Sequence, residues 1–63
     1  MHYTVQFLDD AGNIIEEWHA DANDVAGAIA LIEGISWPLD AARMRILDAG
    51  GLVVHERSRA DDR

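Results

Sequence analysis

The sequence predicts an α+β domain with the element order ββαββ, in which a four-stranded antiparallel sheet has one helix packed on one face. Two segments each consist of an apolar run, a turn containing Asp and Gly, and a second apolar run, which is the pattern of a β-hairpin. Between them, apolar residues recur at the spacing of a helix. The 63 residues suffice for one small domain, expected over 1–56, with a frayed tail over 57–63.

The first hairpin is expected to begin with a strand that has one buried face, because its large apolar residues alternate with polar ones. A four-residue loop over 9–12 would pair Phe7 with Ile14. That register puts Glu16 on the buried face, so Glu16 must lie near an open edge of the sheet, or a bulge must shift the register. The alternating apolar residues are Tyr3, Val5 and Phe7.

The central helix is expected between about Ala22 and Glu33. Asp21 is the expected N-cap and Asp24 the third helical residue, with both carboxylates facing the positive end of the helix dipole. Gly34 is expected to end the helix in a left-handed conformation. One apolar stripe at positions i, i+3, i+4 and i+7 should pack on the sheet; its members are Val25, Ala28, Ile29 and Ile32.

The second hairpin is expected to have its third strand begin near Arg43 and its fourth strand over 52–54, after one short helical turn over 38–43. It is similar in sequence to the first hairpin, because 5–15 aligns with 44–53 when one residue is deleted in the turn. Two explanations stay open: an internal duplication, or a chance similarity that Asp/Gly turn chemistry imposes.

Charge is distributed unevenly along the chain. Residues 1–42 carry eight carboxylates and no Lys or Arg, whereas residues 43–63 carry four carboxylates and five arginines, so the two parts sum to −8 and +1. Such a field repels nucleic acid and anionic membranes and attracts basic surfaces. We therefore expect no direct binding to nucleic acid or to a membrane.

Several classes of protein are disfavoured by composition. The chain has no cysteine, so it forms no disulfide, and its N-terminal residues lack the charged and apolar regions of a signal peptide. We expect a cytoplasmic protein. A homodimer is one way for such a short chain to gain stability.

No catalytic or cofactor-binding motif is present: the sequence has no phosphate-binding glycine loop, nucleophile elbow or metalloprotease helix. Glu16 and Glu17 should point to opposite faces of a strand, so they should not share a proton. Asp9 and Asp10 fall in a turn, where acidic side chains bind the backbone. We expect no enzymatic activity and no cofactor.

The histidines and tryptophans are the remaining candidates. His2, His19 and His55 would form a metal site only if the open ends of the two hairpins met, and we expect no metal. Trp18 fits the buried face of the first hairpin. Trp37 precedes a proline in a loop, where it either covers the core or anchors an interface with a partner.

Residues 1–33 resemble the N-terminal half of HicB-type antitoxins, which begin with a Tyr-Thr-Val-like strand and an acidic hairpin turn and continue to a helix. Those proteins have a third strand and a Pro-Gly-Cys-type segment before the helix, whereas here residues 18–21 lead straight into it. The resemblance therefore transfers no residue and no function.

The function expected from these observations is that of a small, acidic, non-catalytic interaction protein that docks a basic protein surface through residues 1–42. One alternative is a phage- or plasmid-type inhibitor, such as a nucleic-acid mimic, an anti-CRISPR protein or an antitoxin, that occupies a nucleic-acid-binding groove. A second alternative is a histidine-based metal-binding domain or small enzyme. The expected partner-binding residues are Asp9, Asp10, Glu16, Glu17, Asp21, Asp24 and Trp37.

Overall fold

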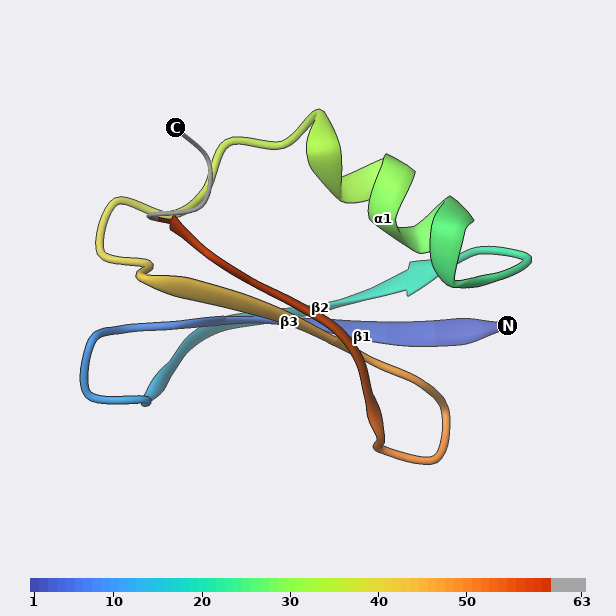
Figure 1. The fold of residues 1–63 in the computed structure, drawn as a ribbon, viewed down its shortest axis with the longest axis horizontal. Coiled ribbons are helices and arrows are strands. Elements are labelled where there is room, and N and C mark those ends of the chain that lie inside the picture. Colours follow the sequence, from blue (N-terminus) through green and yellow to red (C-terminus); the bar gives the residue numbers. More distant parts are fainter. Residues whose placement is uncertain (60–63) are drawn as a thin grey trace.

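The computed structural model describes residues 1–59 and confirms the ββαββ order (Figure 1). Four antiparallel strands form one open sheet in the order β2-β1-β3-β4, so each hairpin makes up one half of the sheet. The helix contacts the two outer strands, β2 and β4. The elements are β1 (His2–Leu8), β2 (Ile14–Asp21), α1 (Val25–Glu33), β3 (Arg43–Leu47) and β4 (Val53–Ser58).

The N-terminus of α1 differs from the expectation. Asp24, not Asp21, is the N-cap, and its Oδ1 accepts a 2.8 Å hydrogen bond from the Gly27 backbone N–H. Asp21 is the last residue of β2 and lies opposite His2. The prediction was wrong because β2 stays paired with β1 as far as Asp21, so the chain must turn before the helix can begin.

The apolar stripe of α1 packs as expected. Ala28 and Ile32 are buried, and Val25 and Ile29 are partly buried against the same core. The C-terminus is different: Gly34 has a φ of −86°, so the expected left-handed residue is wrong, and any residue could adopt this conformation.

The first hairpin is shifted by two residues from the expected register. Phe7 lies opposite Glu16, and a bulge between Phe7 and Leu8 leaves Ile15 as the extra residue before Leu8 pairs with Ile14. The expected pairing of Phe7 with Ile14 is therefore wrong. Glu16 lies on the covered face, but β2 is an outer strand and Glu16 is exposed. The bulge and the open edge together explain how a carboxylate can lie on this face.

The turns of the two hairpins have the same geometry. The backbone N–H of Asp9 donates to the Asn13 carbonyl, and that of Asp48 donates to the Leu52 carbonyl. The N–H groups of Gly12 and Gly51 donate to the carbonyls of Asp9 and Asp48, and these glycines have φ values of 87° and 86°. Only glycine adopts such positive φ at no steric cost. Asp48 lies 39 positions after Asp9, as do the other equivalent turn residues, so the alignment needs no deletion and the expected one is wrong.

The same offset of 39 relates the strands. The second hairpin has its bulge between Ile46 and Leu47. After the bulge, Leu47 pairs with Val53, just as Leu8 pairs with Ile14 in the first hairpin. The central strands β1 and β3 are antiparallel and place Gln6 opposite Arg45, its own equivalent. A pseudo-twofold axis therefore passes through the sheet between these two residues.

The segment before β3 and the end of the chain also differ from the expected boundaries. Residues 38–41 form a turn closed by a 3.0 Å hydrogen bond from the Ala41 N–H to the Pro38 carbonyl, and Arg43 already belongs to β3, so the helical turn expected over 38–43 is not formed. Strand β4 begins at Val53 and continues past 56, because Arg57 and Ser58 still pair with β3. The rest of the expected tail, 60–63, lies outside the described residues.

The sheet has one covered and one open face. The covered face forms the core with Ala28 and Ile32 of α1, and its largest fully buried side chains are Val5, Phe7, Met44 and Ile46. The open face has a polar row that crosses all four strands, and its members are Glu17, Gln6, Arg45 and Glu56. This alternation is typical of an antiparallel sheet with one packed and one solvated face.

Candidate functional site

The strand order separates the charges in space. The first hairpin carries five carboxylates and no Lys or Arg, and it forms the β2–β1 half of the sheet. The arginines of the described chain belong to the other half, in β3, in β4 and directly after β4. The uneven charge of the sequence is thus an uneven charge of the folded molecule, with β2 as an acidic edge strand.

Asp9 and Asp10 lie in the first turn but have different surroundings. Asp9 Oδ1 accepts hydrogen bonds from the backbone N–H groups of Ala11 at 3.0 Å and Asn13 at 2.9 Å. The Asn13 N–H is the largest cause that holds the pKa of the Asp9 carboxyl below its ordinary value of 3.8. Asp10 is exposed. Of the two, Asp9 has a structural role and Asp10 presents its charge to solvent.

Glu16 and Glu17 point to opposite faces of β2, as expected from strand geometry. Glu16 lies opposite Phe7 on the covered face, and Glu17 lies opposite Gln6 on the open face. Glu17 Oε2 accepts a 2.7 Å hydrogen bond from Gln6 Nε2. Both glutamates are exposed, so β2 presents negative charge on either side of the sheet edge.

Asp21 and Asp24 are close in sequence and flank the connection between β2 and α1. The Asp21 carboxylate lies 3.8 Å from the N-terminal ammonium group and 3.3 Å from His2 Nδ1. Asp24 caps the helix. Each of these two carboxylates therefore has a local structural partner, although both are exposed.

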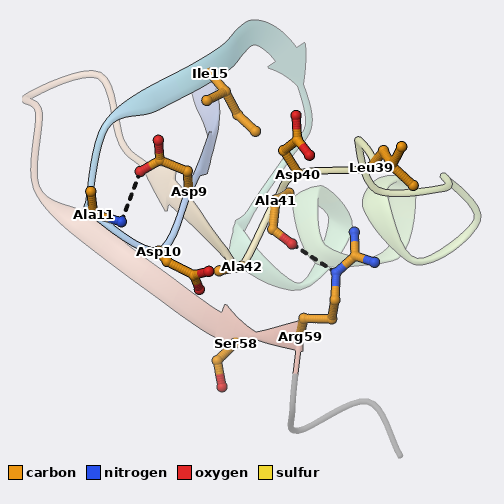
Figure 2. A pocket seen from close by; sticks show the side chains of 10 residues that line it. All are labelled: Asp9, Asp10, Ala11, Ile15, Leu39, Asp40, Ala41, Ala42, Ser58 and Arg59. Atoms are coloured by element: carbon orange, nitrogen blue, oxygen red, sulfur yellow. Dashed lines mark hydrogen bonds between the residues drawn. The ribbon is translucent and has the colours of Figure 1, made fainter.

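A concave region lies at the other end of the first hairpin, beside its turn (Figure 2). Its volume is about 830 Å³, and the Asp40 carboxylate and the exposed Leu39 side chain line it beside the first turn. Arg59 closes one side, where its Nε and Nη2 atoms donate 2.7 Å hydrogen bonds to the carbonyls of Ala41 and Pro38. The residues that line it are Asp9, Asp10, Ala11, Ile15, Leu39, Asp40, Ala41, Ala42, Ser58 and Arg59.

Sequence reasoning did not single out Leu39, Asp40 or Arg59. The available signal for the first two was an apolar residue and a charged residue directly after Trp37-Pro38. No local pattern could have shown that Arg59 would hold the loop over 38–41, because that contact joins segments about 20 residues apart.

Trp37 packs against the core. Its ring makes an edge-to-face contact with Phe7 at a centroid separation of 5.7 Å, and the Arg59 guanidinium lies 5.7 Å from the Trp37 ring. The half-buried ring thus covers the end of the core, which is the first of the two roles considered for it. Among residues 1–59, the ring contacts recorded for Trp37 are with Phe7 and Arg59 and not with the carboxylates of β2.

The three histidines do not converge. His2 and His19 lie in β1 and β2 on the open face, whereas His55 lies opposite Ile46 on the covered face of β4. Within residues 1–59, no group of three His, Cys, Asp or Glu side chains is arranged to hold a metal ion. None of the helices in that range is long and apolar enough to cross a membrane.

Comparisons with protein-family models, with curated proteins and with solved structures find no match to this chain.

Proposed function

We propose that this chain is a small, non-catalytic interaction protein that docks a basic protein surface through its acidic first hairpin. One observation carries the proposal: the strand order places every carboxylate of the first hairpin on one half of the sheet, with β2 at the edge, and the arginines on the other half. A partner that approaches β2 meets Asp10, Glu16 and Glu17 without an intervening cation from that hairpin.

Two features support docking at this edge. Strand β2 is eight residues long and is paired only on its β1 side, so its outer side is accessible to a partner. Exposed charges act mainly through the rate of association and through specificity, because the summed field of a single-sign surface steers a partner of opposite sign. We therefore expect binding to weaken steeply as ionic strength rises and the Debye length falls below about 8 Å.

The pseudo-twofold relation provides a sharp test. Asp10 and Ala49 occupy equivalent exposed positions in the two turns, so the double variant Asp10→Ala/Ala49→Asp moves one carboxylate to the other half without changing net charge. The partner is first captured from a lysate of the source cells by the wild-type protein, identified by mass spectrometry and purified. The rate at which the purified partner associates with the wild-type protein and with the double variant is then measured at several salt concentrations.

The proposal requires a slower association with the double variant and a smaller salt dependence, with thermal stability unchanged. A second matched pair is Glu17→Gln and Glu56→Gln, which remove equivalent charges from the two outer strands. If the double variant binds like the wild type and Glu17→Gln binds like Glu56→Gln, only net charge matters and the acidic hairpin is not the docking surface.

A further inference from the structure

The helix α1 is apolar on the side that faces away from the sheet. Its only charged residue is Glu33 at the last position, and the rest of its sequence consists of Val, Ala, Gly, Ile and Leu. A helix on the surface of a domain normally has a polar outer side, and a helix that is apolar all round is normally buried. The outer side of α1 is therefore unusual for a surface that contacts only water.

We define the outer helix face as three exposed residues of α1: Ala26, Ala30 and Leu31. Leu31, the largest of the three, is 52% exposed. The opposite stripe of α1 is the one that packs on the sheet, so the core does not account for these residues. The two alanines leave the helix backbone close to the surface, which permits the close approach of another helix.

The charges around this face identify the occupant. The N-cap Asp24 and the last helical residue Glu33 place a carboxylate at each end of α1, and the helix has no Lys or Arg. The nearest recorded cation, Arg57, approaches Glu33 from β4 on the sheet side, with a separation of 3.9 Å. A complementary surface is therefore apolar at its centre and basic at its margins.

A second copy of this chain fits poorly. Two outer helix faces packed together would bring Asp24 and Glu33 of one copy near the same carboxylates of the other, in parallel or antiparallel orientation. Each chain also carries a net charge of −7. Charge complementarity favours a basic partner over self-association.

We propose that the outer helix face binds an amphipathic basic helix of a protein partner. The apolar stripe of that helix would pack against Ala26, Ala30 and Leu31, and its flanking Lys and Arg side chains would lie near Asp24 and Glu33. The proposal takes the basic partner from the proposed function, but it places the specific contact on α1 rather than on the first hairpin. Recognition of an amphipathic helix through anchors at i, i+3, i+4 and i+7 is a common mode.

The test uses the full chain labelled with ¹⁵N and a synthetic peptide with leucines at helical spacing on one side and lysines elsewhere. A peptide of the same composition in scrambled order is the control for charge alone. We expect amide shifts over α1 with the amphipathic peptide and weaker, dispersed shifts with the scrambled one. Dissociation constants are measured by titration at physiological ionic strength.

Two variants of the chain probe the face, and one serves as a matched control. Leu31→Gln and Ala30→Arg should each weaken binding of the amphipathic peptide about tenfold or more, because they remove an apolar anchor or place a cation there. Leu52→Gln changes an exposed apolar residue in the second turn and should leave affinity within about twofold. Thermal melting of each variant shows that it is folded.

The proposal is overturned if the scrambled peptide binds equally well, or if Leu31→Gln and Ala30→Arg bind like the control. Sedimentation that reveals a dimer through this face would identify the occupant as a second copy and would also overturn it. Binding of the captured partner separates the two proposals. If only Asp10→Ala/Ala49→Asp binds that partner more weakly, hairpin docking alone is supported. If only Leu31→Gln and Ala30→Arg bind it more weakly, the helix face alone is supported.

Discussion

Gln6 and Arg45 lie opposite each other at the centre of the sheet, where the Arg45 guanidinium donates a 3.1 Å hydrogen bond to the Gln6 side-chain oxygen. They are equivalent positions of the two hairpins, so the pseudo-twofold axis passes between unlike residues. Gln6 then donates to Glu17, and it is only 9% exposed although it belongs to the open face. Three members of the polar row, Glu17, Gln6 and Arg45, thus form a connected network that crosses the boundary between the acidic and basic halves.

This contact predicts a measurable coupling between Gln6 and Arg45. In a double-mutant cycle with Gln6→Ala and Arg45→Ala, urea unfolding should give an interaction free energy of about 0.5–1.5 kcal/mol. Arg45 Nε is buried without a hydrogen-bond partner among the described residues. Arg45→Met should therefore cost less than Arg45→Ala, because it keeps the aliphatic packing and removes that nitrogen. Additive single-variant effects would show that the hydrogen bond contributes nothing.

The packing of α1 predicts unequal effects at two adjacent residues. The Ile32 side chain is 3% exposed in the core, whereas Leu31 faces solvent. Ile32→Ala should lower the free energy of unfolding by about 2–4 kcal/mol, most of the roughly 3–5 kcal/mol that a domain of this size has. Leu31→Ala should change it by no more than about 0.5 kcal/mol. Equal losses in chemical denaturation would contradict the orientation of α1.

The lowered pKa of Asp9 predicts a specific dependence of stability on pH. Because the folded-state pKa lies below the unfolded value of about 3.8, the ionised carboxylate stabilises the fold above that value. The contribution is lost as pH falls through the folded-state pKa. In thermal melts from neutral pH to about pH 2, Asp9→Asn should lose less stability on acidification than the wild type. Asp10→Asn, which removes an exposed neighbour, should follow the wild-type curve.

The contacts of Trp37 predict a loss of stability rather than of partner affinity. Trp37→Ala removes the edge contact with Phe7 and the surface under Arg59, so we expect a loss of about 2–4 kcal/mol in the free energy of unfolding. Trp37→Phe should restore much of it. Faster dissociation of the captured partner from a Trp37→Ala variant of unchanged stability would instead make this residue an interface anchor.

Local chemistry made the element order and the turns predictable. Asp and Gly in each hairpin turn satisfy backbone N–H groups and supply the positive φ values, and both effects act within five residues. The helical stripe at Ala28 and Ile32 follows from the period of an α-helix and needs no knowledge of the sheet. The excess of acidic residues in the first hairpin was likewise visible in the order of residues.

Register and caps were decided by contacts between distant residues. The bulge at Ile15 and the pairing of β2 as far as Asp21 shifted the expected register and moved the N-cap to Asp24, because each depends on what β1 can pair with. The segregation of charge in space arose only when β1 and β3 met at the centre of the sheet. The sequence by itself determined which segments become strands, turns and helix and where the carboxylates occur along the chain. Only the tertiary structure decided that β2 is an acidic edge, that Trp37 is held between Phe7 and Arg59, and that the outer side of α1 stays uncovered, since pairing and burial between remote segments have no local signature.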